Sequence, residues 1–274
     1  MSGAEQARRK LAAAPADLRF AVLFSPRKQR AALTALMAVY LEIREVLQEC
    51  SDSGVARSKL AWWREEIGLL AGHRPRHPLS GNLAPFLPDG YAWQAVLLAI
   101  VAGAETDVTL PAFPQFEDVE RYCASRGGAL LELSAALGGA RCSKALAAAR
   151  NRGTGWQLAE LVLRAGEHAD QGRVYFASAD LHKHSVDRHI AAGVHGNTGL
   201  RALLADYAGR ARAFATAAAP QADALVATRV VSGLACARLK KFATLNYDAA
   251  LPPLELPPFA QLWNAWRSAR RDTH

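Results

Sequence analysis

The sequence predicts an all-α fold, and two observations support that prediction. Alanine, the strongest helix former, makes up about a fifth of the chain, whereas the β-branched residues that favour strands are sparse. Between short clusters of proline and glycine, apolar residues recur with the 3.6-residue spacing of an amphipathic helix. We therefore expect helices over residues 27–49, 56–71, 91–104, 116–137, 143–168, 199–218, 222–246 and 259–271.

The 274 residues are enough to form a large core without help from disulfides or metals. No linker is long enough to divide the chain, so we expect a single domain over 1–274, with flexibility left open for residues 1–18. No uncharged apolar run reaches the roughly 18 residues that a membrane span needs. The four cysteines form no CxxC pair, which is typical of free thiols in a reducing compartment. We expect a cytoplasmic protein.

The formal net charge of +8 admits nucleic acid, an anionic membrane surface or a phosphorylated ligand as partner. The basic residues near the C-terminus lack the pattern that is typical of single-strand binding, so we expect no nucleic-acid partner. Peripheral contact with a membrane stays open.

The predicted helix over residues 27–49 carries a polar stripe beside its apolar face. Ser25 is the expected N-cap of this helix, and Pro26 is expected at its first position. Leu41, Arg44 and Gln48 are spaced three and four residues apart, so they share one side of the helix. By itself such a stripe is typical of a solvated face.

A second polar stripe lies on the predicted helix over residues 143–168. Its members recur at three- and four-residue spacing on a helix that is otherwise largely apolar: Gln157, Glu160, Arg164 and His168. Solvation is again the simplest interpretation of these residues taken alone.

Five sequence segments connect the two stripes to a known family. Sequence segments at Leu23–Glu49, Lys59–Glu66, Phe116–Leu131 and Gly155–Tyr175 occur in that order, followed by the Leu-Trp-x-x-Trp-Arg stretch at Leu262–Arg267. Together they resemble the motif-bearing segments of the squalene/phytoene synthase family over nearly the whole chain. This resemblance implies the all-α isoprenoid-synthase fold, a helical bundle around a central cavity.

The resemblance also implies a chemistry. The family joins two allylic diphosphates head to head, in the synthesis of precursors of squalene, hopanoids or carotenoids. Two Asp-x-x-x-Asp motifs on facing helices are expected to hold Mg²⁺, which binds the diphosphate oxygens. Carboxylates four residues apart suit that role because they share one helix face.

This chain departs from the family at those positions. Arg44 and Gln48 stand where the first motif implies aspartates, and Arg164 and His168 stand where the second does. An arginine cannot ligate Mg²⁺, because its guanidinium has only donors and a fixed positive charge. We therefore interpret the chain as a divergent member with both Asp-rich motifs lost, and we expect no metal and no cofactor.

Other cavity positions of the family are partly retained. Glu160 takes the place of an asparagine, and Leu41 and Leu163 take the places of two arginines that contact diphosphate. The positions that match the family are Tyr122, Gln157, Gly172, Arg173 and Tyr175. No residue is confidently identified as catalytic.

Two interpretations of Arg44 and Arg164 remain open. In one, they pair with Glu160 or other carboxylates in a structural ion-pair network. In the other, they hold an anionic head group directly, since a guanidinium fits phosphate and carboxylate.

The function predicted from the sequence is that of a catalytically degenerate squalene/phytoene synthase-like protein. It would bind a prenyl diphosphate or another anionic lipid, or engage a protein partner in assembly. In the second role it is similar to the mitochondrial complex I assembly factor with a phytoene-synthase-like domain. The alternative is an active prenyl transferase that uses displaced carboxylates at Glu45, Glu49 and Glu167. A third possibility is a peripheral membrane protein whose basic surface docks on anionic lipid.

Overall fold

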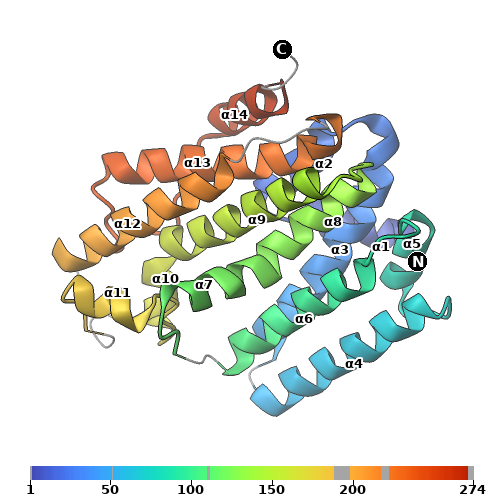
Figure 1. Ribbon diagram of the computed structural model, residues 1–274, viewed down its shortest axis with the longest axis horizontal. Coiled ribbons are helices and arrows are strands. Elements are labelled where there is room, and N and C mark those ends of the chain that lie inside the picture. The colour runs from blue at the N-terminus through green and yellow to red at the C-terminus, as the bar shows by residue number, and fades with distance from the viewer. Residues whose placement is uncertain (1, 51, 110–111, 188–197, 217–221, 271–274) are drawn as a thin grey trace.

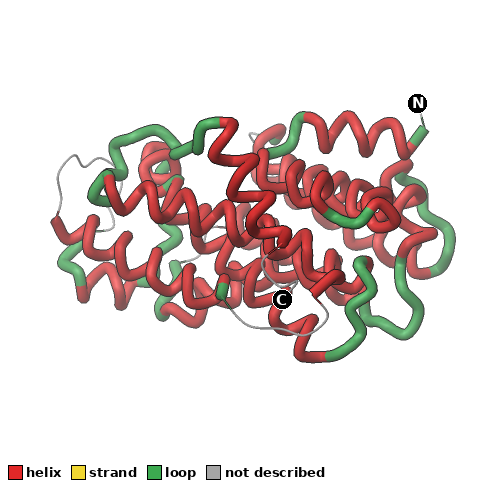
Figure 2. Tube along the Cα trace, turned by 90° about the horizontal axis from the view of Figure 1, so that it is seen from above, coloured by secondary structure: helices red, strands yellow, loops and turns green. Residues whose placement is uncertain are grey.

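The computed structural model describes residues 2–50, 52–109, 112–187, 198–216 and 222–270. Within these ranges every regular element is helical, as the red segments of Figure 2 show. The all-α prediction is therefore confirmed. No described helix is both long enough and apolar enough to cross a lipid bilayer.

Figure 1 shows how the helices are arranged. Their bounds are α1 Gly3–Ala12, α2 Ala16–Phe24, α3 Arg27–Glu49, α4 Ser53–Ala71, α5 Pro78–Leu83, α6 Trp93–Thr109, α7 Phe116–Cys123, α8 Ala129–Leu137, α9 Ser143–Leu163, α10 Ala165–Asp170, α11 Ser178–Lys183, α12 Thr198–Ala215, α13 Val226–Thr244 and α14 Pro258–Arg270.

Helix α9 runs through the middle of the bundle. It packs against α8, α12 and α13, and in Figure 1 it lies between the layers that these helices form. Most of its second half is buried, from Arg152 to Leu163. A helix that is covered on nearly all sides needs small residues where neighbours approach, and Gly153 and Gly155 supply them.

The segment predicted as one helix over residues 116–137 is interrupted by a π-helical turn. Helix α7 ends at Cys123, Ala124–Gly128 forms the π-helical turn, and α8 continues from Ala129. Such a turn inserts one extra residue and rotates the side chains that follow it. Here the turn packs against α9, and its residue Arg126 is buried.

The N-terminal part of the chain is largely helical where the structure describes it. Residues 1–18 include α1 and the first turn of α2, and Ala7 and Leu18 are fully buried. Ser25 does not cap α3 as expected. Its hydroxyl instead donates to the carbonyl oxygen of Ala21 at 2.7 Å, at the end of α2, and Pro26 takes the N-cap position of α3.

We expect Gly153→Ala to destabilise the protein by about 2 kcal/mol or more. A Cβ at this position would lie 2.0 Å from the carbonyl oxygen of Gly127, so the π-helical turn and α9 would have to separate. The matched control is Gly209→Ala, on an exposed part of α12 where an added Cβ meets nothing within 4 Å. That change should stabilise the protein by about 0.5–1 kcal/mol through helix propensity. Urea unfolding measures both, and equal effects would contradict this account of the close contact.

Candidate functional site

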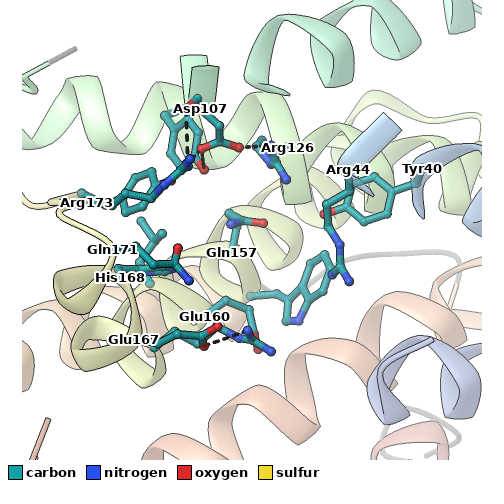
Figure 3. A pocket seen from close by; sticks show the side chains of 15 residues that line it. Tyr40, Arg44, Asp107, Arg126, Gln157, Glu160, Glu167, His168, Gln171 and Arg173 are labelled. Carbon is teal, nitrogen blue, oxygen red and sulfur yellow. Dashed lines mark hydrogen bonds and ion pairs between the residues drawn. The ribbon is translucent and has the colours of Figure 1, made fainter. Parts of the chain in front are cut away.

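A polar cavity of about 490 Å³ lies between α3, α6, the α7 region, α9 and α10 (Figure 3). Its wall is formed by side chains from elements far apart in the sequence. They are Tyr40, Arg44, Asp107, Tyr122, Arg126, Trp156, Gln157, Glu160, Leu161, Arg164, Glu167, His168, Gln171, Arg173 and Tyr175.

Asp107, at the end of α6, organises one side of this cavity. Tyr122 donates its hydroxyl to Asp107 Oδ1 at 2.6 Å, and Tyr175 donates to the same oxygen at 3.0 Å. The other carboxylate oxygen, Oδ2, forms an ion pair with Arg126, and Asp107 is buried. Burial raises the pKa of Tyr122 well above its usual value and that of Tyr175 to about 12, so both hydroxyls keep their protons and donate.

The carboxylates on the opposite side of the cavity are also engaged by cations. Glu160 forms an ion pair with Arg238, which also reaches Asp17 at 3.4 Å. Arg164 lies 3.5 Å from Glu160 and 3.0 Å from Glu167. Of the two interpretations of Arg164, these contacts favour the ion-pair network.

Arg44 has a different environment. Within the described part of the chain no carboxylate pairs with it, and its Nε is buried without a hydrogen-bond partner. In Figure 3 it extends into the cavity next to Tyr40, on the side away from Arg173. The interpretation as an anion-binding residue therefore fits Arg44 better than the ion-pair interpretation does.

Arg173 contributes a further guanidinium to the wall. It donates to the backbone carbonyl oxygen of Asp107 at 3.4 Å and to the Tyr175 hydroxyl oxygen at 3.3 Å. Both acceptors are neutral, and no carboxylate of the described residues pairs with Arg173. Arg44 and Arg173 thus leave the cavity with an excess of positive charge.

His168 lies on α10 with its ring edge-on to Tyr175, at 4.8 Å between centroids. Burial, together with the nearby positive charge of Arg164, lowers the pKa of His168 to about 4. The imidazole is therefore neutral near pH 7, and it adds no charge to the cavity.

The structure brings most of the sequence-predicted site residues to one cavity. Those on its wall are Arg44, Tyr122, Gln157, Glu160, Arg164, His168, Arg173 and Tyr175. Leu41 is buried in the core and is not part of the wall. The side chain of Gln48 lies outside the part that the structure describes.

Sequence reasoning missed several wall residues, chiefly Asp107 and Arg126. The sequence contains a feature that points to each of these two residues. Asp107 is an acid near the end of a helix that is otherwise mostly apolar, and Arg126 directly precedes two glycines that let α9 approach. Only the fold shows that the two residues meet.

The carboxylates of this cavity do not suit Mg²⁺, which the family resemblance implies. Mg²⁺ demands several oxygen ligands in near-octahedral geometry. The oxygens of Asp107 accept from two tyrosines and Arg126, while Glu160 and Glu167 bind arginines. Among the described residues, no group of three or more His, Cys, Asp or Glu side chains gathers as a metal site.

Comparisons with known proteins agree with this architecture. A sequence model of the family described as squalene/phytoene synthase matches residues 13–260. No curated protein matches the chain. A dehydrosqualene synthase solved in complex with ligand superposes with a TM-score of 0.80 at 14% identity, covering 97% of this chain and 98% of the other.

Two further solved structures are similar. The squalene synthase HpnC from Alicyclobacillus acidocaldarius has a TM-score of 0.75 at 17% identity, with 90% of this chain and 95% of that chain covered. YisP from Bacillus subtilis has a TM-score of 0.59 at 15% identity, covering 95% and 93%. At these identities the structures show a shared fold.

We expect Asp107→Asn to cost about 3 kcal/mol of stability, because it leaves the buried guanidinium of Arg126 without its counter-charge. Tyr175→Phe removes one hydrogen bond to the same carboxylate and should cost only about 1 kcal/mol. Urea unfolding of the two variants provides the comparison. Similar losses would mean that the ion pair contributes no more than a single hydroxyl.

The lowered pKa of His168 predicts a pH dependence of stability. The unfolded state takes up a proton near pH 6.5, and the folded state only near pH 4, so acid favours unfolding across that window. Relative to His168→Gln, the wild type should lose about 3 kcal/mol between pH 6.5 and pH 4 and nothing above pH 6.5. Denaturant unfolding of both proteins along this pH range tests it, and parallel curves would argue against a buried neutral imidazole.

Proposed function

The chain belongs to the squalene/phytoene synthase family, and we propose that it is a catalytically degenerate member that binds the anionic head group of a prenyl lipid without metal. The single observation that carries the proposal is Arg44. It points into the cavity where the family resemblance implies a metal-binding aspartate, and its Nε has no protein partner among the described residues. The Nε is closed to solvent, so we expect the anion to bind the end of the guanidinium, which no carboxylate of the described residues engages.

The charge balance of the wall supports an anionic ligand. Asp107 is neutralised by Arg126, and Glu160 and Glu167 are neutralised by Arg238 and Arg164. Among the described residues, Arg44 and Arg173 then have no carboxylate partner, and when Asp17, which shares Arg238, is counted, the cluster still keeps a net positive charge. Guanidinium groups bind phosphate oxygens in bidentate geometry, so a diphosphate or phosphate head group matches this pair of charges.

The wall next to Arg44 is aromatic and suits the hydrocarbon part of such a ligand. Tyr40 and Trp156 lie side by side, with 6.3 Å between ring centroids, and Leu161 follows on α9. Ligand cavities commonly combine apolar walls with a few polar groups that orient the head group. A cavity of about 490 Å³ has the size that is typical of small-molecule sites.

The alternative of an active transferase depends on displaced carboxylates. Glu45 pairs with Lys10 at 2.8 Å, and Glu49 pairs with Lys59 at 3.3 Å. Neither contributes to the cavity wall, which leaves Glu167 as the one member of that set that does. This arrangement favours a binding role over metal-dependent ionisation.

The proposal places the protein in the cytoplasm. None of the four cysteines forms a disulfide, which suits a reducing compartment. In the cytoplasm the protein would carry or sense a lipid ligand. In an assembly role with a protein partner, the same helical bundle would act without a ligand.

A thermal-shift titration with farnesyl diphosphate tests the proposal. We expect the ligand to raise the melting temperature equally with Mg²⁺ and with EDTA. Arg44→Gln should weaken binding roughly thirtyfold, because it removes a charge-assisted contact of about 2 kcal/mol. The matched control is Arg57→Gln, an exposed arginine on α4 outside the cavity, which should leave binding unchanged.

The other outcomes contradict the proposal in distinct ways. A shift that requires Mg²⁺, or release of pyrophosphate, would indicate the active transferase, and Glu167→Gln should then abolish turnover. No shift under either condition would indicate a structural or assembly role. Binding that is equal in Arg44→Gln and the wild type would place the head group elsewhere.

A further inference from the structure

Helix α14 exposes an apolar face on the outside of the bundle. Phe259 is 87% exposed, Leu262 44% and Trp263 58%, which makes this the most exposed cluster of large apolar residues among those that the structure describes. Their spacing of three and four residues places them on one side of the helix. In Figure 1, α14 lies at the outer edge, beyond α13.

The opposite side of α14 is firmly attached to the bundle. Ala265 and Ser268 are buried, and Ser268 lies so close to Gly233 of α13 that a Cβ there would meet its hydroxyl oxygen at 2.0 Å. Arg229 donates to the carbonyl oxygens of Ser268 at 3.3 Å and Ala269 at 3.0 Å. The exposed face is therefore held outward by packing.

Positive charge accompanies the exposed aromatic rings. Arg267 and Arg270 lie in the last turn of α14, and the helix contains no acidic residue. The guanidinium of Arg270 lies over the ring of Trp266 at 4.6 Å, and Trp266 stacks on Trp263 at 5.0 Å. The nearest acids along the chain lie outside the helix, at Glu255 before it and Asp272 after it.

We propose that α14 docks flat on an anionic lipid surface. Tryptophan and phenylalanine on one face with arginines beside them are typical of helices that lie in the membrane interface. The arginines match the negative charge of such a surface. A second copy of the chain fits less well, because a symmetric contact through α14 would bring like charges together with no acid on the helix to balance them. The proposal is independent of what the cavity binds.

Flotation with vesicles of equimolar phosphatidylcholine and phosphatidylglycerol tests this docking. We expect the wild type to float with these vesicles, to bind phosphatidylcholine vesicles much less, and to detach at high salt. The double variant Phe259→Ser/Trp263→Ser should bind at least about tenfold more weakly, since each ring has on the order of 150 Å² of surface to bury. Arg267→Gln should bind about fivefold more weakly through loss of one charge.

Matched controls come from α4, at the opposite edge of the bundle in Figure 1. Val55→Ser changes another half-exposed apolar residue, and Arg57→Gln another exposed arginine; both should float like the wild type. Circular dichroism establishes that each variant is folded. Failure of the wild type to float, or equal flotation of the α14 and α4 variants, would overturn the proposal. A dimer that the double variant abolishes, without vesicle binding by the wild type, would identify a second copy as the occupant instead.

Discussion

The buried ion pair between Asp107 and Arg126 connects the parts of the chain that form the cavity. Asp107 comes from α6 and Arg126 from the π-helical turn, while the tyrosines that donate to the same carboxylate come from α7 and from the segment after α10. A buried charge is stable only when paired and hydrogen-bonded. One carboxylate therefore fixes three separate segments relative to one another, and the cavity exists where they meet.

The pairing of buried charges also determines which charged side chains on the cavity wall are left to bind a ligand. Each carboxylate on the wall has an arginine partner, so none is free to act as a metal ligand or to repel an anion. The surplus guanidiniums, Arg44 and Arg173, come from opposite ends of the sequence that forms the wall. On the function that we propose, Arg44, which stands where the family resemblance implies an aspartate, gives the cavity an anion site in place of a cation site.

The sequence predicted the bundle well because helix periodicity is a local property. Helix α3 spans Arg27–Glu49, which agrees with the predicted range of 27–49. The all-α class and the family were predicted from local sequence signals of the same kind. The π-helical turn after Cys123 and the break at Arg164 were not predicted. Both depend on contacts with other helices, which override local propensity. Asp107 was missed for the same reason, since its partners lie 15 to 68 residues away.

The position of the unpaired donor on Arg44 has a consequence for how the cavity is used. A buried donor with no acceptor costs free energy on the order of 1–3 kcal/mol, which packing elsewhere must offset. An arginine left in this state calls for an explanation, and the one that we propose is an anion bound by its guanidinium. Replacing Arg44 with a neutral side chain would remove this cost. It would also remove the attraction for an anion. The retained arginine, beside an aromatic wall and opposite Arg173, therefore favours a cavity that is completed by binding over one that is merely structural.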